Sequence, residues 1–190
     1  IKELNKVRDD IFWTILSPEH IKSLAFDNTE QLIINLPSYP NKMRTHFNAD
    51  EIIKVIDWRN NDYDVVYSHL PEQTLALSNL FTNSTNISPK IIGYSHWFEV
   101  KENSNYEPTM LAQNLLGILQ MDECGVNSKW LKEFVIKKSK ELLSDKQVKQ
   151  LEEIIQPHYL GIDDVSPNHK YEPKTILFNH RDNDYTGYSW

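Results

Sequence analysis

The stretch Asp64-Val-Val-Tyr-Ser-His69, followed at once by Pro71-Glu-Gln73, decides the predicted fold of this chain. Its first part is a short run of valines and a tyrosine, which is typical of a buried β-strand. Its second part places a proline in the first turn of a helix, where proline is well tolerated. The helix that it opens carries Leu75, Leu77 and Leu80. The stretch therefore predicts a strand–turn–helix unit.

The same order of a short apolar run and a helical pattern recurs along the chain. Strands are predicted at 11–16, 31–36, 64–69, 90–96, 121–126 and 158–162, and helices begin near positions 18, 48, 71, 108, 127 and 145. Asn48 is a predicted N-cap because Glu51 stands three residues later. Pro157 is expected to break the last helix. This alternation predicts an α/β fold, a Rossmann-like parallel sheet with helices on both faces.

Composition excludes several classes of protein. The 190 residues carry 20 Lys and Arg against 27 Asp and Glu, a formal net charge of −7. We expect no nucleic-acid partner, because phosphate neutralisation needs clustered cations. The one cysteine excludes an internal disulfide and a cysteine-based zinc cage, and the scattered histidines form no His-x-x-x-His pair, so no metal site is expected.

Neither a signal-peptide pattern nor an apolar run of the about 20 residues that span a bilayer is present. We therefore expect a cytoplasmic protein without stable membrane insertion, and the sequence leaves its oligomeric state open. The chain starts at Ile1 and ends on an aromatic segment, Tyr185–Trp190, which indicates a piece of a longer chain.

The chain is expected to hold one domain and the start of another. Residues 1–163 form the predicted Rossmann-like domain, whose first strand would precede Ile1. Residues 164–173 are rich in Asp, Pro and Asn and are a predicted linker. Residues 174–190 are interpreted as the first strand of a second, truncated domain.

Polar side chains follow four of the predicted strands. Two strands end alike, in Tyr67-Ser-His69 and Tyr94-Ser-His96, a third is followed by Asn127-Ser128, and a fourth ends in Asn179-His180-Arg181. Ligands of parallel sheets bind beyond the carboxyl ends of the strands. We therefore expect these side chains to line one rim.

Structural alternatives stay open for most of them. For His96, a structural role with its ring nitrogens hydrogen-bonded within the fold is as plausible as a functional role. For His69, the structural role is favoured. Capping of the following helix by itself accounts for Asn127 and Ser128. A serine hydrolase is disfavoured, because no Gly-x-Ser-x-Gly elbow surrounds a serine at the strand ends.

Four segments, taken in order, resemble a GT-B glycosyltransferase of group 1, the glycogen-synthase-like type. They are the strand that ends in His96, Cys124–Lys132, Pro157–Asp163 and Lys174–Arg181, and the resemblance covers about residues 60–190. It implies an acceptor-side domain, a linker and the start of a donor-binding domain. It also implies transfer of a sugar from a nucleotide-diphosphate sugar to a glycan or small-molecule acceptor in the cleft between the domains, with no metal and no further cofactor.

The resemblance also implies roles for individual residues. His96 would be catalytic, bonding a hydroxyl of the transferred sugar or assisting proton transfer. Arg181 would bind the donor diphosphate, with Thr186 and Gly187 in the family's Lys-Gly position, so that Thr186 replaces the usual lysine. The residues on the acceptor side would be His69, Glu72, Asn127 and Ser128.

Two other functions remain open at this stage. One is a non-catalytic α/β module that binds a sugar or a nucleotide. The other is an epimerase or hydrolase of UDP-sugars on the same two-domain fold. The sequence does not decide the sugar, the nucleotide, the acceptor or the stereochemical outcome.

Overall fold

The computed structural model describes residues 5–18, 26–34, 48–56, 62–84, 88–96, 98 and 108–159. The chain divides into two units, Ile1–Tyr159 and Leu160–Trp190, and all of the described residues belong to the first. The predicted linker at 164–173 and the predicted strand at 174–190 lie outside them.

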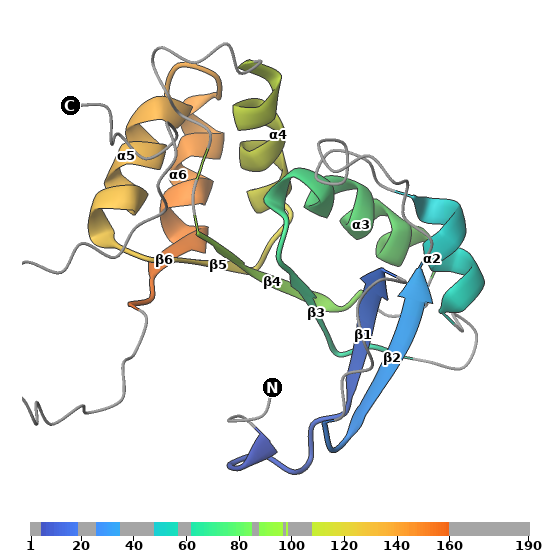
Figure 1. Ribbon diagram of the computed structural model, residues 1–190. Helices are drawn as coiled ribbons and strands as arrows, with labels where there is room; N and C mark the ends of the chain where they lie inside the picture. The colour runs from blue at the N-terminus through green and yellow to red at the C-terminus, as the bar shows by residue number, and fades with distance from the viewer. Residues whose placement is uncertain are drawn as a thin grey trace, which may run out of the picture. The chain divides into compact units, whose positions relative to one another are not determined.

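The strands form two parallel sheets (Figure 1). The first sheet pairs β1 (Trp13–Pro18) with β2 (Thr29–Ile34). The second has the order β3-β4-β5-β6, built from β3 (Val65–Ser68), β4 (Lys90–Ser95), β5 (Glu123–Val126) and β6 (Ile155–Pro157), and every neighbouring pair is parallel. The predicted α/β class with parallel strands is therefore confirmed.

Helices connect the strands of the second sheet, and they start where the sequence predicts. They are α3 (Pro71–Ser84), α4 (Pro108–Ile118), α5 (Lys129–Ser139) and α6 (Asp145–Ile154), while α2 (Ala49–Val55) precedes the sheet and packs on β2. The predicted N-cap of α2 is confirmed, because Asn48 Oδ1 accepts a hydrogen bond from the backbone N–H of Glu51 at 3.3 Å.

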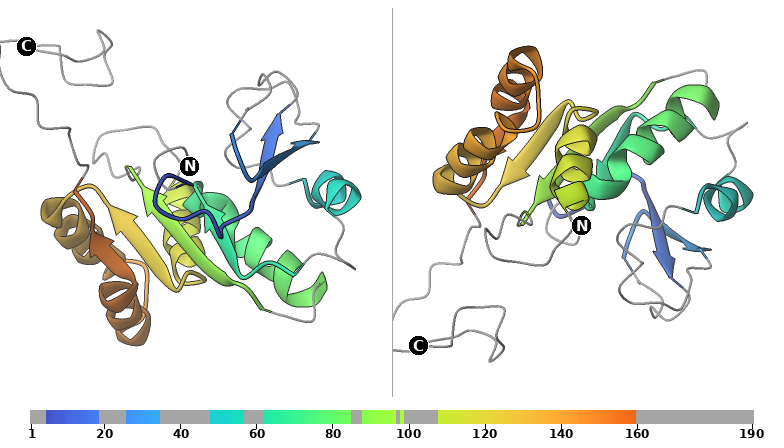
Figure 2. Two further views of the ribbon diagram at one scale, coloured as in Figure 1. Left: turned by 90° about the horizontal axis from the view of Figure 1, so that it is seen from below. Right: turned by 90° about the horizontal axis from the view of Figure 1, so that it is seen from above.

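The four helices α3–α6 lie on one face of the four-stranded sheet, as the views from below and above show (Figure 2). A right-handed connection returns over the same face as long as the strand order does not reverse, and β3-β4-β5-β6 runs in one direction. Among the described residues the prediction of helices on both faces is thus met on one face only.

Alternation along β4 separates the two faces of this sheet. Ile91, Gly93 and Ser95 are buried beneath the helices, whereas Ile92 and Tyr94 are half-buried and point to the other face. The core lies on the helix side, where Leu115, Ile118, Cys124, Val126, Val135, Leu151 and Ile155 have no exposed surface. Each aliphatic side chain buried in this way stabilises the fold by about 1.5–3 kcal/mol.

Helices α3 and α4 pack in direct backbone contact at Gly117. A Cβ added to Gly117 would collide with the carbonyl group of Pro71 and would lie 3.4 Å from Cβ of Thr74. Only glycine allows this approach, so Gly117 sets the distance between α4 and the start of α3.

Two sequence predictions are wrong in detail. The last strand of the described residues is β6, Ile155–Pro157, and His158 and Tyr159 of the predicted strand 158–162 follow it. The N–H of His158 still donates to the Val126 carbonyl of β5 at 2.8 Å. Pro157 does not break the helix, because the chain is already extended at Ile155. A proline is tolerated there because β6 is paired on one side only in the described sheet.

The second error concerns Pro18. It ends β1, where the sequence predicts a helix start. A proline at the end of a strand removes no hydrogen bond from the interior of the sheet. Proline is therefore tolerated at a strand end as well as at a helix start. The rest of that predicted helix, from position 19, lies outside the described residues.

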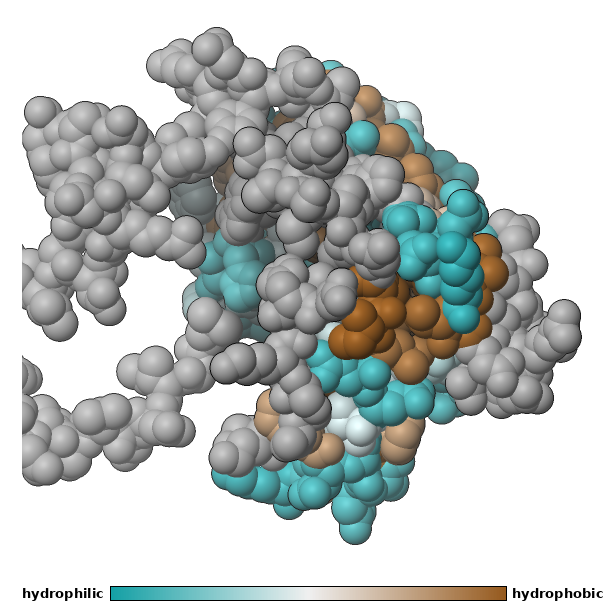
Figure 3. Space-filling model, turned by 45° about the vertical axis from the view of Figure 1, so that its right-hand side comes forward, coloured by the Kyte–Doolittle hydropathy of each residue, from teal (hydrophilic) through white to brown (hydrophobic). Residues whose placement is uncertain are grey.

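The described surface mixes hydrophobic and hydrophilic residues, and in one view a hydrophobic area is flanked by hydrophilic side chains (Figure 3). Exposed apolar side chains include Val65, Trp130 and Leu142. Within the described ranges, no helix combines the length and the apolar character needed to cross a membrane.

Candidate functional site

The two Tyr-Ser-His sequences bring their histidines together. His69 directly follows β3 and His96 directly follows β4, and the two strands are parallel neighbours. The centroids of the two imidazole rings are 5.4 Å apart, with the ring planes at 81°. The predicted convergence of these two strand ends is therefore present, with both side chains exposed.

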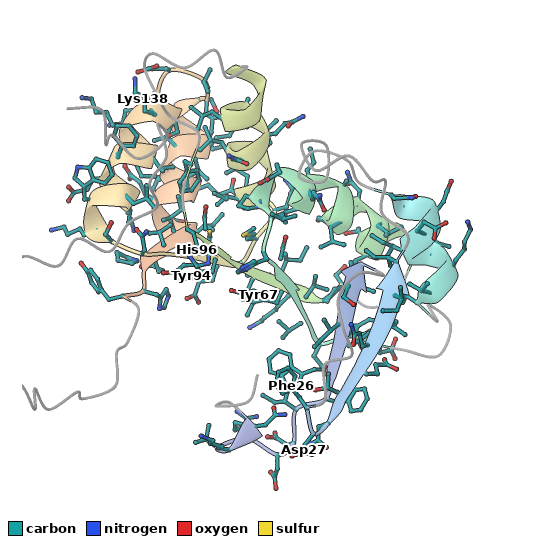
Figure 4. The ribbon with its side chains drawn as sticks, in the orientation of Figure 1. Phe26, Asp27, Tyr67, Tyr94, His96 and Lys138 are labelled. Atoms are coloured by element: carbon teal, nitrogen blue, oxygen red, sulfur yellow. The ribbon has the colours of Figure 1, made fainter. Side chains whose placement is uncertain are left out.

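Two tyrosines extend this contact into a cluster of four rings. Tyr67 lies 5.8 Å from His69, and Tyr94 lies 4.8 Å from His96, measured between ring centroids. We call Tyr67, His69, His96 and Tyr94 the ring cluster. Figure 4 shows Tyr67, Tyr94 and His96 on the side of the sheet away from α3–α6, which agrees with the burial of Ser68 and Ser95 on the opposite side.

The tyrosines were missed in the sequence, although a signal for them exists. In each Tyr-Ser-His sequence the tyrosine and the histidine are two residues apart, and alternate residues of a strand share a face. Once Ser68 is assigned to the core, Tyr67 must point to the other face together with His69.

Tyr67 is the most exposed tyrosine of the cluster and keeps its proton. Its side chain is 53 % exposed. Partial burial raises the pKa of Tyr67 above its ordinary value, and the neighbouring Cys124 and Tyr94 add to the effect. The phenol is therefore a neutral hydrogen-bond donor at physiological pH.

Tyr94 is held in place from two directions. Its hydroxyl donates a hydrogen bond to the backbone carbonyl of His158 at 3.1 Å. Its ring lies over Gly125, where an added Cβ would stand 2.7 Å from Tyr94 Cδ2 and 3.1 Å from His158 Cδ2. The missing side chain at position 125 therefore makes room for both rings.

A hydrogen-bonded pair of an imidazole and a carboxylate lies beside Tyr94. His158 Nε2 is 2.9 Å from Glu123 Oε1. Both side chains are more than half exposed, at 55 % and 53 %, so the pair contributes little to stability. It does place a carboxylate and an imidazole on the same face as the ring cluster, and neither residue was singled out in the sequence, because their contact depends on the β5–β6 register.

Asn127 and Ser128 connect the next strand end to the cluster. The amide of Asn127 donates to the backbone carbonyl of His96 at 3.1 Å, and its Oδ1 accepts from the hydroxyl of Ser128, also at 3.1 Å. Ser128 Oγ in turn accepts from the N–H of Leu131 and caps α5. The capping alternative is therefore confirmed for Ser128, and Asn127 links β5 to the backbone of His96.

Of the remaining predicted site residues, one lies in the described part of the chain and three lie outside it. Glu72 is half-buried in the first turn of α3, whose start is fixed by a 2.6 Å hydrogen bond between the hydroxyls of Ser68 and Thr74. Arg181, Thr186 and Gly187, the predicted donor-binding residues, lie outside the described residues.

Cys124 is buried in the middle of β5. Burial raises the pKa of its thiol from 9.0 to about 12, although a backbone hydrogen bond from Ser95 opposes the shift. The thiol stays protonated at neutral pH and is not a nucleophile. In the described part of the chain, no group of three or more His, Cys, Asp and Glu side chains is arranged to hold a metal ion.

The chain was compared with family models, curated proteins and solved structures, and none of them matches it.

Proposed function

We propose that this chain is part of a glycosyltransferase that moves a sugar from a nucleotide-diphosphate sugar to an acceptor. One observation carries the proposal: the ends of β3 and β4 place the imidazoles of His69 and His96 5.4 Å apart, at the edge where parallel sheets bind their ligands. A pair of exposed imidazoles suits hydroxyl chemistry, because a neutral imidazole both donates and accepts a hydrogen bond.

In this proposal His96 bonds a hydroxyl of the transferred sugar or assists the proton transfer from the acceptor. His69 and Glu72 contact the acceptor. Asn127 acts as a positioning residue, because its side chain already bonds the His96 carbonyl. Arg181, Thr186 and Gly187 bind the donor, with Arg181 offsetting the charge that develops on the leaving diphosphate.

The test is release of nucleoside diphosphate by the native full-length protein, with UDP-, GDP- and ADP-sugars as donors. We expect one class of donor to be turned over and the sugar to appear on an added glycan or small acceptor. Free sugar without a glycosylated product would favour a hydrolase, and an altered donor sugar would favour an epimerase. Donor binding without turnover would favour the binding module.

Substitutions at two residues connect the activity to the proposed site. His96→Ala should lower kcat by about 10²-fold or more, the usual contribution of a positioned acid or base, and His96→Gln should retain part of donor binding. Arg181→Ala should weaken nucleoside-diphosphate binding. The control is Lys137→Ala, which removes an exposed cation from the last turn of α5. Equal effects of His96→Ala, Arg181→Ala and Lys137→Ala would contradict the proposal.

A further inference from the structure

We propose that the ring cluster of Tyr67, His69, His96 and Tyr94 is a stacking platform for an uncharged pyranose ring. Only the identification of this pyranose as the acceptor rests on the proposed function. It therefore narrows the acceptor to a neutral glycoside that presents an apolar C–H face.

Continuity of the rings is the first argument. Three successive contacts, with centroid distances of 5.8, 5.4 and 4.8 Å, join the four side chains in the order Tyr67, His69, His96, Tyr94. Each contact falls within the separation at which aromatic rings attract one another. The four side chains thus form one continuous cluster at the ends of β3 and β4, with neighbouring ring planes inclined at 33°, 81° and 60°; Figure 4 labels Tyr67, His96 and Tyr94 of this cluster.

Preorganisation is the second argument. The Tyr94 hydroxyl is bonded to the His158 carbonyl, and Gly125 leaves space for the Tyr94 ring above β5. The His96 backbone is bonded by Asn127. The Tyr94 ring, fixed in this way, and the braced backbone of His96 lose little conformational freedom when a ligand binds, and such loss is a main cost of binding. Tyr67 and the two histidines are nevertheless exposed and open to a ligand.

Charge decides between an uncharged ring and a nucleotide. The carboxylate of Glu123 lies 2.9 Å from the imidazole of His158, the residue whose backbone carbonyl accepts the Tyr94 hydroxyl, and the chain as a whole carries −7. A carboxylate repels a phosphate, whereas it accepts hydrogen bonds from sugar hydroxyls. Aromatic stacking with a few polar groups at the margin is the usual composition of a small-molecule site.

The experiment is a titration of the 190-residue chain, followed by the imidazole and tyrosine ring resonances. The probes are methyl α- and β-D-glucopyranoside, maltotriose and cellotriose, with uridine and uridine monophosphate for comparison. We expect one of the glycosides to shift the signals of His69, His96 and Tyr94. Tyr67→Ala should weaken its binding about 2- to 10-fold, the range for one aromatic contact, and Tyr67→Phe should bind like the wild type.

The matched control is Trp130→Ala. It removes a side chain that is 67 % exposed and stacks on Phe134 of α5, outside the ring cluster, so binding should not change. Stronger shifts with uridine or its monophosphate than with every glycoside would overturn the proposal, as would the absence of any shift with all four glycosides.

The outcome is separable from that of the proposed function. Glycoside binding without turnover of any nucleotide sugar would leave the platform standing and reject the transferase. Transfer activity whose acceptor KM is unchanged in Tyr67→Ala would support the transferase and reject the platform.

Discussion

The side-chain amide of Asn127 donates a hydrogen bond of 3.1 Å to the backbone carbonyl of His96. The residue after β5 thereby fixes the backbone of the residue after β4, at the point where the imidazole of His96 meets His69 and Tyr94. The rim of the sheet is thus braced across strands by side-chain bonds in addition to its backbone ladder.

Asn127→Asp tests this brace directly. The carboxylate still accepts the Ser128 hydroxyl but cannot donate to the His96 carbonyl, so we expect a loss of about 1 kcal/mol in the free energy of unfolding, measured by urea denaturation. The ring resonances of His96 should shift more than those of His158. Unchanged stability together with unchanged His96 signals would show that the bond has no positioning role.

Ser128→Ala removes the N-cap of α5. We expect it to lower the free energy of unfolding by about 0.5–2 kcal/mol, because the N–H of Leu131 loses its partner. Ser128→Asp should restore most of the loss, since aspartate also caps helices and its charge favours a helix N-terminus. Thermal denaturation of both variants, with Lys137→Ala as the surface control, gives the answer.

Gly117→Ala should destabilise the protein although alanine is the better helix former. A substitution of glycine by alanine within a helix normally gains about 1 kcal/mol, but here the new methyl group would collide with the Pro71 carbonyl. Overpacking of this kind costs about 1–3 kcal/mol. Gln113→Ala, at an exposed site of the same helix, should be neutral or stabilising, and the same response of both variants in urea denaturation would contradict the packing of α3 on α4.

The thiol of Cys124 should react with Ellman's reagent much more slowly in the native protein than in urea. The thiolate attacks the disulfide of the reagent and releases its thiolate half, and the Cys124 thiolate is scarce at neutral pH because burial raises the pKa to about 12. A native rate equal to the unfolded rate at pH 8 would show that the residue is accessible.

The same shift predicts a dependence of stability on alkaline pH. The native thiol keeps its proton longer than the unfolded one, so its contribution is fully present below pH 9.0 and is lost between about 9 and about 12. This contribution is at most about 4 kcal/mol. Cys124→Ala should reduce the loss of stability over that pH range. If the free energy of unfolding of the variant depends on pH as that of the wild type does, the loss of stability comes from other groups.

Local signals made the element types predictable. Asn48 with Glu51 and Pro71 with Glu72 mark helix starts through bonds and torsions of neighbouring residues, and the structure keeps both. Pro157 misled the prediction, because a proline suits a helix end and an edge strand equally. The choice depends on the pairing of β6 with β5, which no neighbour in the sequence reveals.

Part of the site was predictable, and the rest depends on the pairing of distant strands. The parallel arrangement alone brings His69 and His96 to one edge, and the structure places them there. The contacts of Tyr94 with His158 and of Glu123 with His158 span 64 and 35 residues. They depend on strand register, so the sequence pattern could not supply them.

The buried position of Cys124 also has a practical consequence. Since this chain holds a single native thiol and that thiol is shielded within β5, a cysteine introduced at an exposed position such as Lys137 would take up a maleimide dye without removal of the native residue. Fluorophores attached in this way would report movements of α5 in a protein whose interior is otherwise unaltered.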